Sequence, residues 1–110
     1  MGGRVTYPGE FEQVVLLAVA RLGADAYGMS IRSEIHTRAG RPATIGAVYA
    51  TLERLVAKGL ARETDQPGGA ERSGLARRFY AITPAGKTAL ENAREVQLRM
   101  WAGLKIRLPR

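Results

Sequence analysis

The chain has 110 residues, of which 45% are hydrophobic and 25% charged, with no cysteine and a net charge of +7. This length suits one domain with a modest core, and the lack of cysteine excludes disulfides and thiolate metal sites. The positive charge favours a polyanionic partner, nucleic acid before an anionic membrane surface. Neither an apolar run of about 18 residues nor a secretory signal pattern occurs, so we expect a soluble cytoplasmic protein without a membrane partner.

Two helices are predicted before residue 40. The first begins at Glu10, where the helix dipole favours acidic residues, and ends at Gly23. Its apolar residues recur on one side of the helix: Phe11, Val14, Val15, Ala18 and Leu22. The second helix covers residues 28–39 and ends at Gly40, after which Pro42 favours a turn.

The third predicted helix lies within residues 44–60, TIGAVYATLERLVAKGL, and two of its sides differ in character. One side is apolar: Ile45, Val48, Leu52, Leu55 and Val56. The other is small near its start and cationic near its end: Thr44, Ala47, Thr51, Arg54 and Lys58. Small side chains allow close approach to a surface and cations suit phosphate, so we expect this side to lie exposed in a DNA major groove. An ordinary amphipathic helix with a solvated basic face is the alternative.

A hairpin and a fourth helix are predicted for the rest of the chain. Residues 60–64 and 77–82 have the composition of strands, and the glycine-rich segment 66–76 between them is typical of a long hairpin tip. Thr83 and Pro84 then mark the start of a helix. Its apolar residues follow a spacing of three and four: Leu90, Ala93, Val96, Met100, Trp101 and Leu104.

The order of these elements predicts an α+β, mostly α, winged helix-turn-helix: three helices, a two-stranded wing and a C-terminal helix. The third helix would be the recognition helix. Residues 1–9 are expected to form a flexible arm, residues 10–83 the DNA-binding domain, and residues 84–110 a dimerisation helix with a basic tail.

Three sequence blocks resemble the PadR family of bacterial winged-helix repressors. They are AYGMSI at residues 26–31, TIGAVYATLERLVAKGL at 44–60 and RRFYAITPAGKTAL at 77–90. The middle block is similar to the family's Gly–x–x–Tyr–x–x–Leu–x–x–Leu pattern with a Gly-aliphatic helix end: Gly46, Tyr49, Leu52, Leu55, Gly59 and Leu60. The last block resembles its aromatic–x–aliphatic–Thr–x–x–Gly junction: Tyr80, Ile82, Thr83 and Gly86.

This resemblance implies a homodimer that represses transcription. The last helix would pack across the partner and present two recognition helices to a two-fold operator. Some members release DNA when they bind a small molecule. Because the chain stops after one C-terminal helix, it resembles the short subgroup of the family.

Residues on several elements are expected to contact double-stranded DNA. The methyl groups of Ala47 and Thr51 could touch thymine, and Arg72 in the wing could enter the minor groove. The other expected contacts are Tyr27, Ser30, Arg41, Thr44, Tyr49, Arg54, Lys58 and Arg77. Packing alone is the alternative role for the two tyrosines, and helix capping is the alternative for Ser30 and Thr44.

The apolar residues of the last helix are expected to join two subunits: Leu90, Ala93, Val96, Met100, Trp101 and Leu104. In such a dimer, Trp101 and its symmetry mate could stack a small planar aromatic effector. His36 is the only histidine and the chain has no cysteine, so we expect no metal site. No nucleophile–base pair and no phosphate-binding loop are recognisable, so we expect no enzymatic activity and no cofactor.

Two other functions remain open at this point. One is a winged-helix module that docks an acidic protein, and the other is a sensor of drugs or aromatic ligands centred on the dimer interface. Binding of RNA fits less well, because the surface aromatic clusters that stack single-stranded bases are missing.

Overall fold

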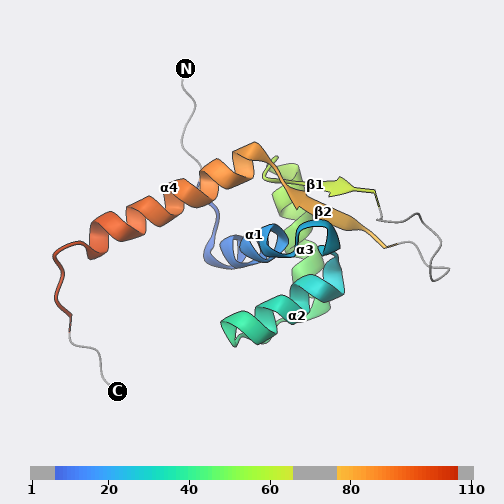
Figure 1. Cartoon of the computed structure of the whole chain (residues 1–110), viewed down its shortest axis with the longest axis horizontal. Helices are drawn as coiled ribbons and strands as arrows, with labels where there is room; N and C mark the ends of the chain where they lie inside the picture. The colour runs from blue at the N-terminus through green and yellow to red at the C-terminus, as the bar shows by residue number, and fades with distance from the viewer. Residues whose placement is uncertain (1–6, 66–76, 107–110) are drawn as a thin grey trace.

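The computed structural model describes residues 7–65 and 77–106, and its elements occur in the predicted order (Figure 1). They are α1 (Glu10–Leu22), α2 (Gly28–Ala39), α3 (Ile45–Ala57), β1 (Ala61–Thr64), β2 (Phe79–Ile82) and α4 (Pro84–Trp101), with a short 3-10 turn, η1, at Gly23–Asp25. The mostly helical fold with a two-stranded antiparallel sheet is thus confirmed. Residues 1–6 of the expected arm, residues 66–76 with Arg72, and residues 107–110 of the basic tail lie outside the described residues.

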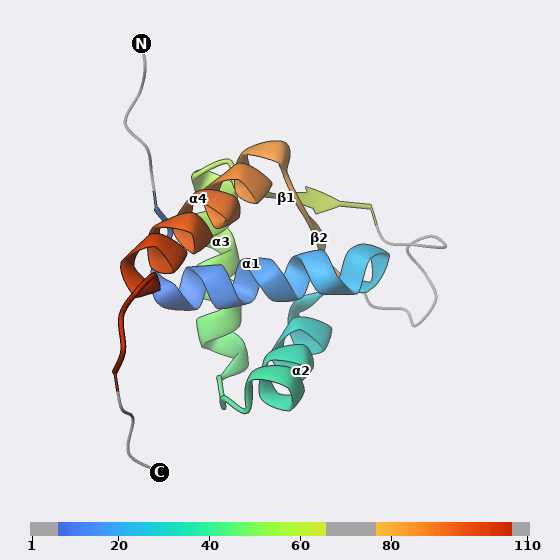
Figure 2. The same ribbon diagram turned by 60° about the vertical axis from the view of Figure 1, so that its left-hand side comes forward.

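Helix α1 is the centre of the fold, and it packs against α2, α3, β2 and α4. Figure 2 shows α1 crossing in front of α3, with α2 below it. Because neighbours cover more than one flank of α1, its buried arc is wider than the predicted stripe. Leu16 and Val19, which lie outside that stripe, are fully buried together with Val15.

Local signals set the ends of α2 and α3. Gly40 ends α2 in the left-handed conformation, with a φ of 63°, which side chains other than glycine rarely adopt. The Thr44 hydroxyl accepts a hydrogen bond from the Ala47 N–H at 3.0 Å and so caps α3, as predicted. Both helices then contribute to the common core: Ile31, Ile35, Val48, Leu52 and Leu55.

A backbone hydrogen bond joins the hairpin to the turn before α2. Ala61 pairs with Ile82 and Thr64 pairs with Phe79, which defines the register of β1 and β2. The Tyr80 N–H donates to the Ala26 carbonyl at 2.9 Å and ties β2 to the turn before α2. The base of the wing is therefore held at a set position beside the start of α2.

A glycine lets α4 start directly against the end of α3. The Thr83 hydroxyl accepts from the Gly86 N–H at 3.0 Å and donates to the Gly59 carbonyl at 2.7 Å. A Cβ on Gly86 would collide with the Leu60 carbonyl oxygen, so only glycine fits there. Ala89 and Leu90 still pack in the core, and the C-terminal part of α4 projects away from the body of the protein (Figure 1). Among the described residues, no helix has both the length and the hydropathy to cross a membrane.

Candidate nucleic-acid interface

Helix α3 presents three distinct sides. Val48, Leu52 and Leu55 point into the core. A second side, which we call the α1-facing side, consists of Thr51, Arg54 and Lys58. The third is exposed and lies opposite the core, and we call it the outward face: Gly46, Ala50, Glu53 and Ala57.

The expectation that Thr51 lies exposed on a bare polar side is wrong. Thr51 is 1% exposed, and its hydroxyl accepts a hydrogen bond from the Arg54 guanidinium at 3.1 Å. Because α1 packs against α3, Thr51 lies in the interior, while Arg54 and Lys58 on the same flank stay partly exposed. A methyl group in this position cannot reach a base edge while the domain stays folded.

Arg54 and Lys58, which were expected to bind phosphate, pair with a carboxylate of α1. Lys58 Nζ lies 2.9 Å from both carboxylate oxygens of Glu12, and Arg54 Nε lies 3.4 Å from one of them. Glu12 also accepts a hydrogen bond from the Gly9 N–H at 2.9 Å, and its side chain is only 9% exposed. Both cations are therefore drawn toward α1.

The protonation of Glu12 reflects this network. Burial alone raises the pKa of the Glu12 carboxyl, but hydrogen bonds from Lys58 and the Gly9 N–H, with further contributions from the Lys58 charge and Arg54, leave it below its ordinary 4.5. Glu12 is therefore ionised at neutral pH, and it neutralises part of the positive charge at the end of α3.

Thr44, Ala47 and Arg41 lie together at the start of α3. They line an open hollow whose floor includes Phe11. The Arg41 guanidinium stacks over the Phe11 ring at 5.0 Å from its centroid and pairs with the exposed carboxylate of Glu10 at 2.6 Å. Ala47 and Thr44 are both exposed, and the Thr44 hydroxyl caps the helix. The first turn of α3 is therefore accessible from outside.

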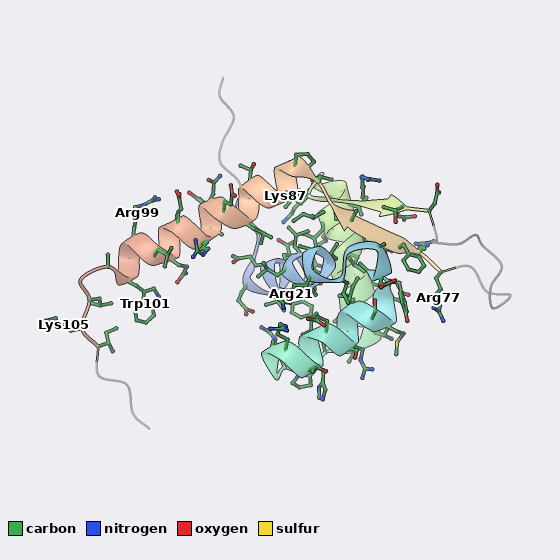
Figure 3. All side chains as sticks on the ribbon, in the orientation of Figure 1. Arg21, Arg77, Lys87, Arg99, Trp101 and Lys105 are labelled. Carbon is green, nitrogen blue, oxygen red and sulfur yellow. The ribbon has the colours of Figure 1, made fainter. Side chains whose placement is uncertain are left out.

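Tyr27 links the wing to the start of α2. Its ring lies 5.2 Å from that of Phe79, and the Arg77 guanidinium lies 4.6 Å from the Tyr27 ring centroid. Figure 3 shows Arg77 next to the start of β2, beside α2. Ser30 accepts a hydrogen bond from the Tyr27 N–H at 2.9 Å and donates to the Asp25 carbonyl at 2.6 Å, so its hydroxyl serves the start of α2.

Tyr49 connects α3 to the start of α2. A Cβ on Gly28 would collide with the Tyr49 ring and hydroxyl, so glycine is required for this contact. The tyrosine is nevertheless 38% exposed, which means that packing and an external contact are both available to it. Gly28 was not recognised as part of the site, although its position directly after Tyr27 in the AYGMSI block was a signal for it.

Two other residues of this surface were missed. Glu12 stands three residues after Gly9, a spacing that indicates a capping carboxylate but not its partners on α3. Glu53 lies on the outward face, and a helical projection of residues 44–60 could have placed it there. Among the described residues, no cluster of histidine, aspartate and glutamate is arranged to hold a metal ion.

The residues of α4 divide into two groups. Ala93 is buried and Leu90 packs against the core, so these two attach α4 to its own chain rather than lying free for a partner, contrary to the expectation. Beyond the half-buried Val96 the apolar residues are exposed, with Met100 at 74% and Trp101 at 51%. Leu104 is also exposed, and Figure 3 shows Trp101 far from the body of the protein.

Comparisons with known structures agree on the fold. In the complex structure of hsRosR-S1, the matched chain is 26% identical in sequence to this one. The match covers 88% of this chain and 79% of that chain, with a TM-score of 0.64. RosR from H. salinarum is 24% identical over 93% of this chain and 84% of its own, with a TM-score of 0.66. A PadR family transcription regulator from hypervirulent Clostridium difficile is 23% identical to this chain. The match covers 82% of this chain and 88% of that regulator, with a TM-score of 0.62.

A search of curated proteins gave no match. The sequence model of the transcriptional regulator PadR-like family matches residues 16–92, which include all of α2, α3 and both strands. This family consists of transcription regulators rather than enzymes, so the expectation of a non-enzymatic, DNA-binding regulator is confirmed at that level. Together with the winged-helix geometry, the match shows that the chain belongs to the transcriptional regulator PadR-like family.

Proposed function

We propose that this protein is a homodimeric repressor that recognises a two-fold DNA operator. The observation that carries the proposal is the outward face of α3, where Gly46, Ala50 and Ala57 leave the helix backbone open to close approach. A Cβ on Gly46 would meet nothing within 4 Å, so internal packing does not require glycine there. Glycine is also a poorer helix former than alanine. Close approach of a DNA groove accounts for its presence.

The surroundings of this face suit the sugar-phosphate backbone. The N-termini of α2 and α3 carry backbone N–H groups that attract phosphate even though Ser30 and Thr44 act as caps. Arg41 and Arg77 supply cations beside these two helix ends. Arg72, which lies outside the described residues, is proposed as a further DNA contact. Tyr27 and Tyr49 can add contacts from their exposed edges.

Within this proposal, Ala47 and Ala50 replace Thr51 as the small residues next to the bases. Arg54 and Lys58 brace α3 against α1 through Glu12, so their role is to set the angle of the recognition helix. A cation that is already paired with a nearly buried carboxylate would have to give up part of that ion pair to bind phosphate, so Arg54 and Lys58 are poorer phosphate contacts than their charge suggests.

The exposed end of α4 supports dimerisation. Leu98, Met100 and Trp101 near the end of α4, and Leu104 just beyond it, are exposed apolar side chains, and exposed apolar side chains that gather in one region mark interaction sites. A second copy is the partner that would match it, because a two-fold dimer pairs the same patch on both subunits. Two recognition helices would then face successive turns of the operator.

A small aromatic effector is the second candidate function for the same region. Trp101 is half exposed next to Met100, and a tryptophan face in an apolar gap between subunits can stack a planar ligand. Binding there would change how the two copies of α4 pack, and DNA release would be the output.

Selection of binding sites from random duplex DNA tests the proposal most directly. We expect an inverted repeat whose affinity falls steeply with salt, because bound phosphates release counterions. Sedimentation in the same buffer should show a dimer. Enrichment of no sequence, together with salt-independent or absent DNA binding, would contradict the proposal and favour the role of a module that docks an acidic protein.

A further inference from the structure

The outward face of α3 carries one charged group, and it has the same sign as DNA. Glu53 lies on this face one helical turn after Tyr49 and is exposed. Its neighbours along the face, Gly46, Ala50 and Ala57, have no side chain beyond Cβ. Glu53 is therefore the side chain that protrudes furthest from the surface that would approach the bases.

No cation within the described residues compensates for this carboxylate. Hydrogen bonds and ion pairs in those ranges leave the Glu53 side chain without a partner, whereas Glu10, Glu12, Glu34 and Glu95 each pair with an arginine or lysine. Arg54, the adjacent residue, is turned toward Glu12 and Thr51. Glu53 thus keeps its full acceptor capacity for an external donor.

A carboxylate in this position weakens binding to phosphate but can accept hydrogen bonds from a base. In the major groove, cytosine presents the N4 amino donor, while guanine O6 and N7 and thymine O4 are acceptors that repel a carboxylate. Adenine offers an amino donor next to the N7 acceptor, which makes it a poorer partner. The chemistry of the face therefore discriminates between base pairs rather than raising affinity in general.

We propose that Glu53 is a specificity-determining residue that accepts a hydrogen bond from the N4 amino group of a cytosine in each operator half-site. This inference rests on the proposed DNA-binding function and names one base that it reads. Arg41 and Arg77, the cations proposed to bind phosphate, lie on other parts of the chain, Arg41 paired with Glu10 and Arg77 over the Tyr27 ring. Phosphate binding would thus be separated in space from base reading.

The test uses the full-length protein and a randomised duplex library at fixed salt. Glu53→Ala and Glu91→Ala each remove one negative charge, but Glu91 lies on α4, away from α3. We expect wild type to prefer cytosine at one position of each half-site by about 5- to 150-fold. Glu53→Ala should lose this preference at that position alone, and Glu53→Gln should shift it toward adenine. Glu91→Ala should keep it.

Three outcomes would overturn the inference. In the first, Glu53→Ala and Glu91→Ala both raise the affinity for every sequence by the same factor. Glu53 would then act only through its negative charge and would not read a base. All base preferences could stay unchanged in Glu53→Ala, which places the residue away from the groove. Failure of wild type itself to enrich any sequence would remove the proposed function and this inference together. Circular dichroism of each variant checks that the helices are retained.

Discussion

Replacing Glu12 with glutamine tests whether the two cations of α3 are held by the Glu12 carboxylate. The amide oxygen of the substituted side chain would still accept from the Gly9 N–H, so the cap on α1 is kept. What is lost is the negative charge that Lys58 and Arg54 share. The variant therefore isolates the ionic contact between α1 and α3.

The loss of stability expected for Glu12→Gln follows from the exposure of Glu12 and of the two cations that it pairs with. Lys58 and Arg54 are more than a third exposed, so screening limits each ion pair to about 1 kcal/mol. The Glu12 carboxylate is nearly buried, and hydrogen bonds to a buried charged group contribute about 1.5–3 kcal/mol. We expect Glu12→Gln to lower the free energy of unfolding by about 1–3 kcal/mol at pH 7, or about 5–15 °C in Tm for a chain of this size.

The pH dependence of this stability difference is a second test of the role of Glu12. The pKa of Glu12 is lower in the folded protein than its ordinary 4.5, so its stabilising contribution is fully present above the unfolded value. This contribution is lost as the pH falls through the folded value. The stability difference between wild type and Glu12→Gln should stay constant from pH 7 to about 5 and close below about pH 4.

Thermal unfolding followed by circular dichroism, at one protein concentration, measures both effects. Glu10→Gln is the matched control, because it removes the same charge from the same helix turn but only from a largely exposed pair with Arg41. That control should change stability by less than about 0.5 kcal/mol. If Glu12→Gln is no less stable than Glu10→Gln, or if its deficit does not vary with pH, the reasoning about Glu12 is refuted.

Five further substitutions, grouped in three tests, probe the other contacts. Gly86→Ala should destabilise the fold by about 1–3 kcal/mol, because the added Cβ would meet the Leu60 carbonyl. Gly46→Ala should instead raise the Tm slightly and weaken DNA binding. A Gly86→Ala protein that melts like wild type would contradict the predicted clash. Arg77→Gln should lower the slope of log affinity against log salt by about one, while Lys58→Met leaves it unchanged, and equal slopes for both would return Lys58 to the phosphate contacts. Met100→Asp should shift sedimentation from dimer to monomer, and an unaltered mass would exclude this end of α4 from the interface.

The elements and their order could be predicted from the sequence because their signals are local. Thr44 and Thr83 cap helices through N–H groups three residues away, and Gly40 supplies a backbone conformation that other residues avoid. Periodicity likewise identified the core positions Val48, Leu52 and Leu55. These interactions need no distant part of the chain.

The side of α3 that faces outward was decided by the tertiary structure. Hydrophobic periodicity locates the centre of a buried stripe but not its width, and the width depends on which helix lies alongside. Here α1 covers the flank of α3 that carries Thr51 and brings Glu12 to Lys58 across 46 residues of sequence. A small hydroxyl residue and two cations look the same in sequence whether water or a carboxylate lies beside them. Only the packing of α1 buried Thr51, paired the two cations with Glu12 and left Glu53 on the surface.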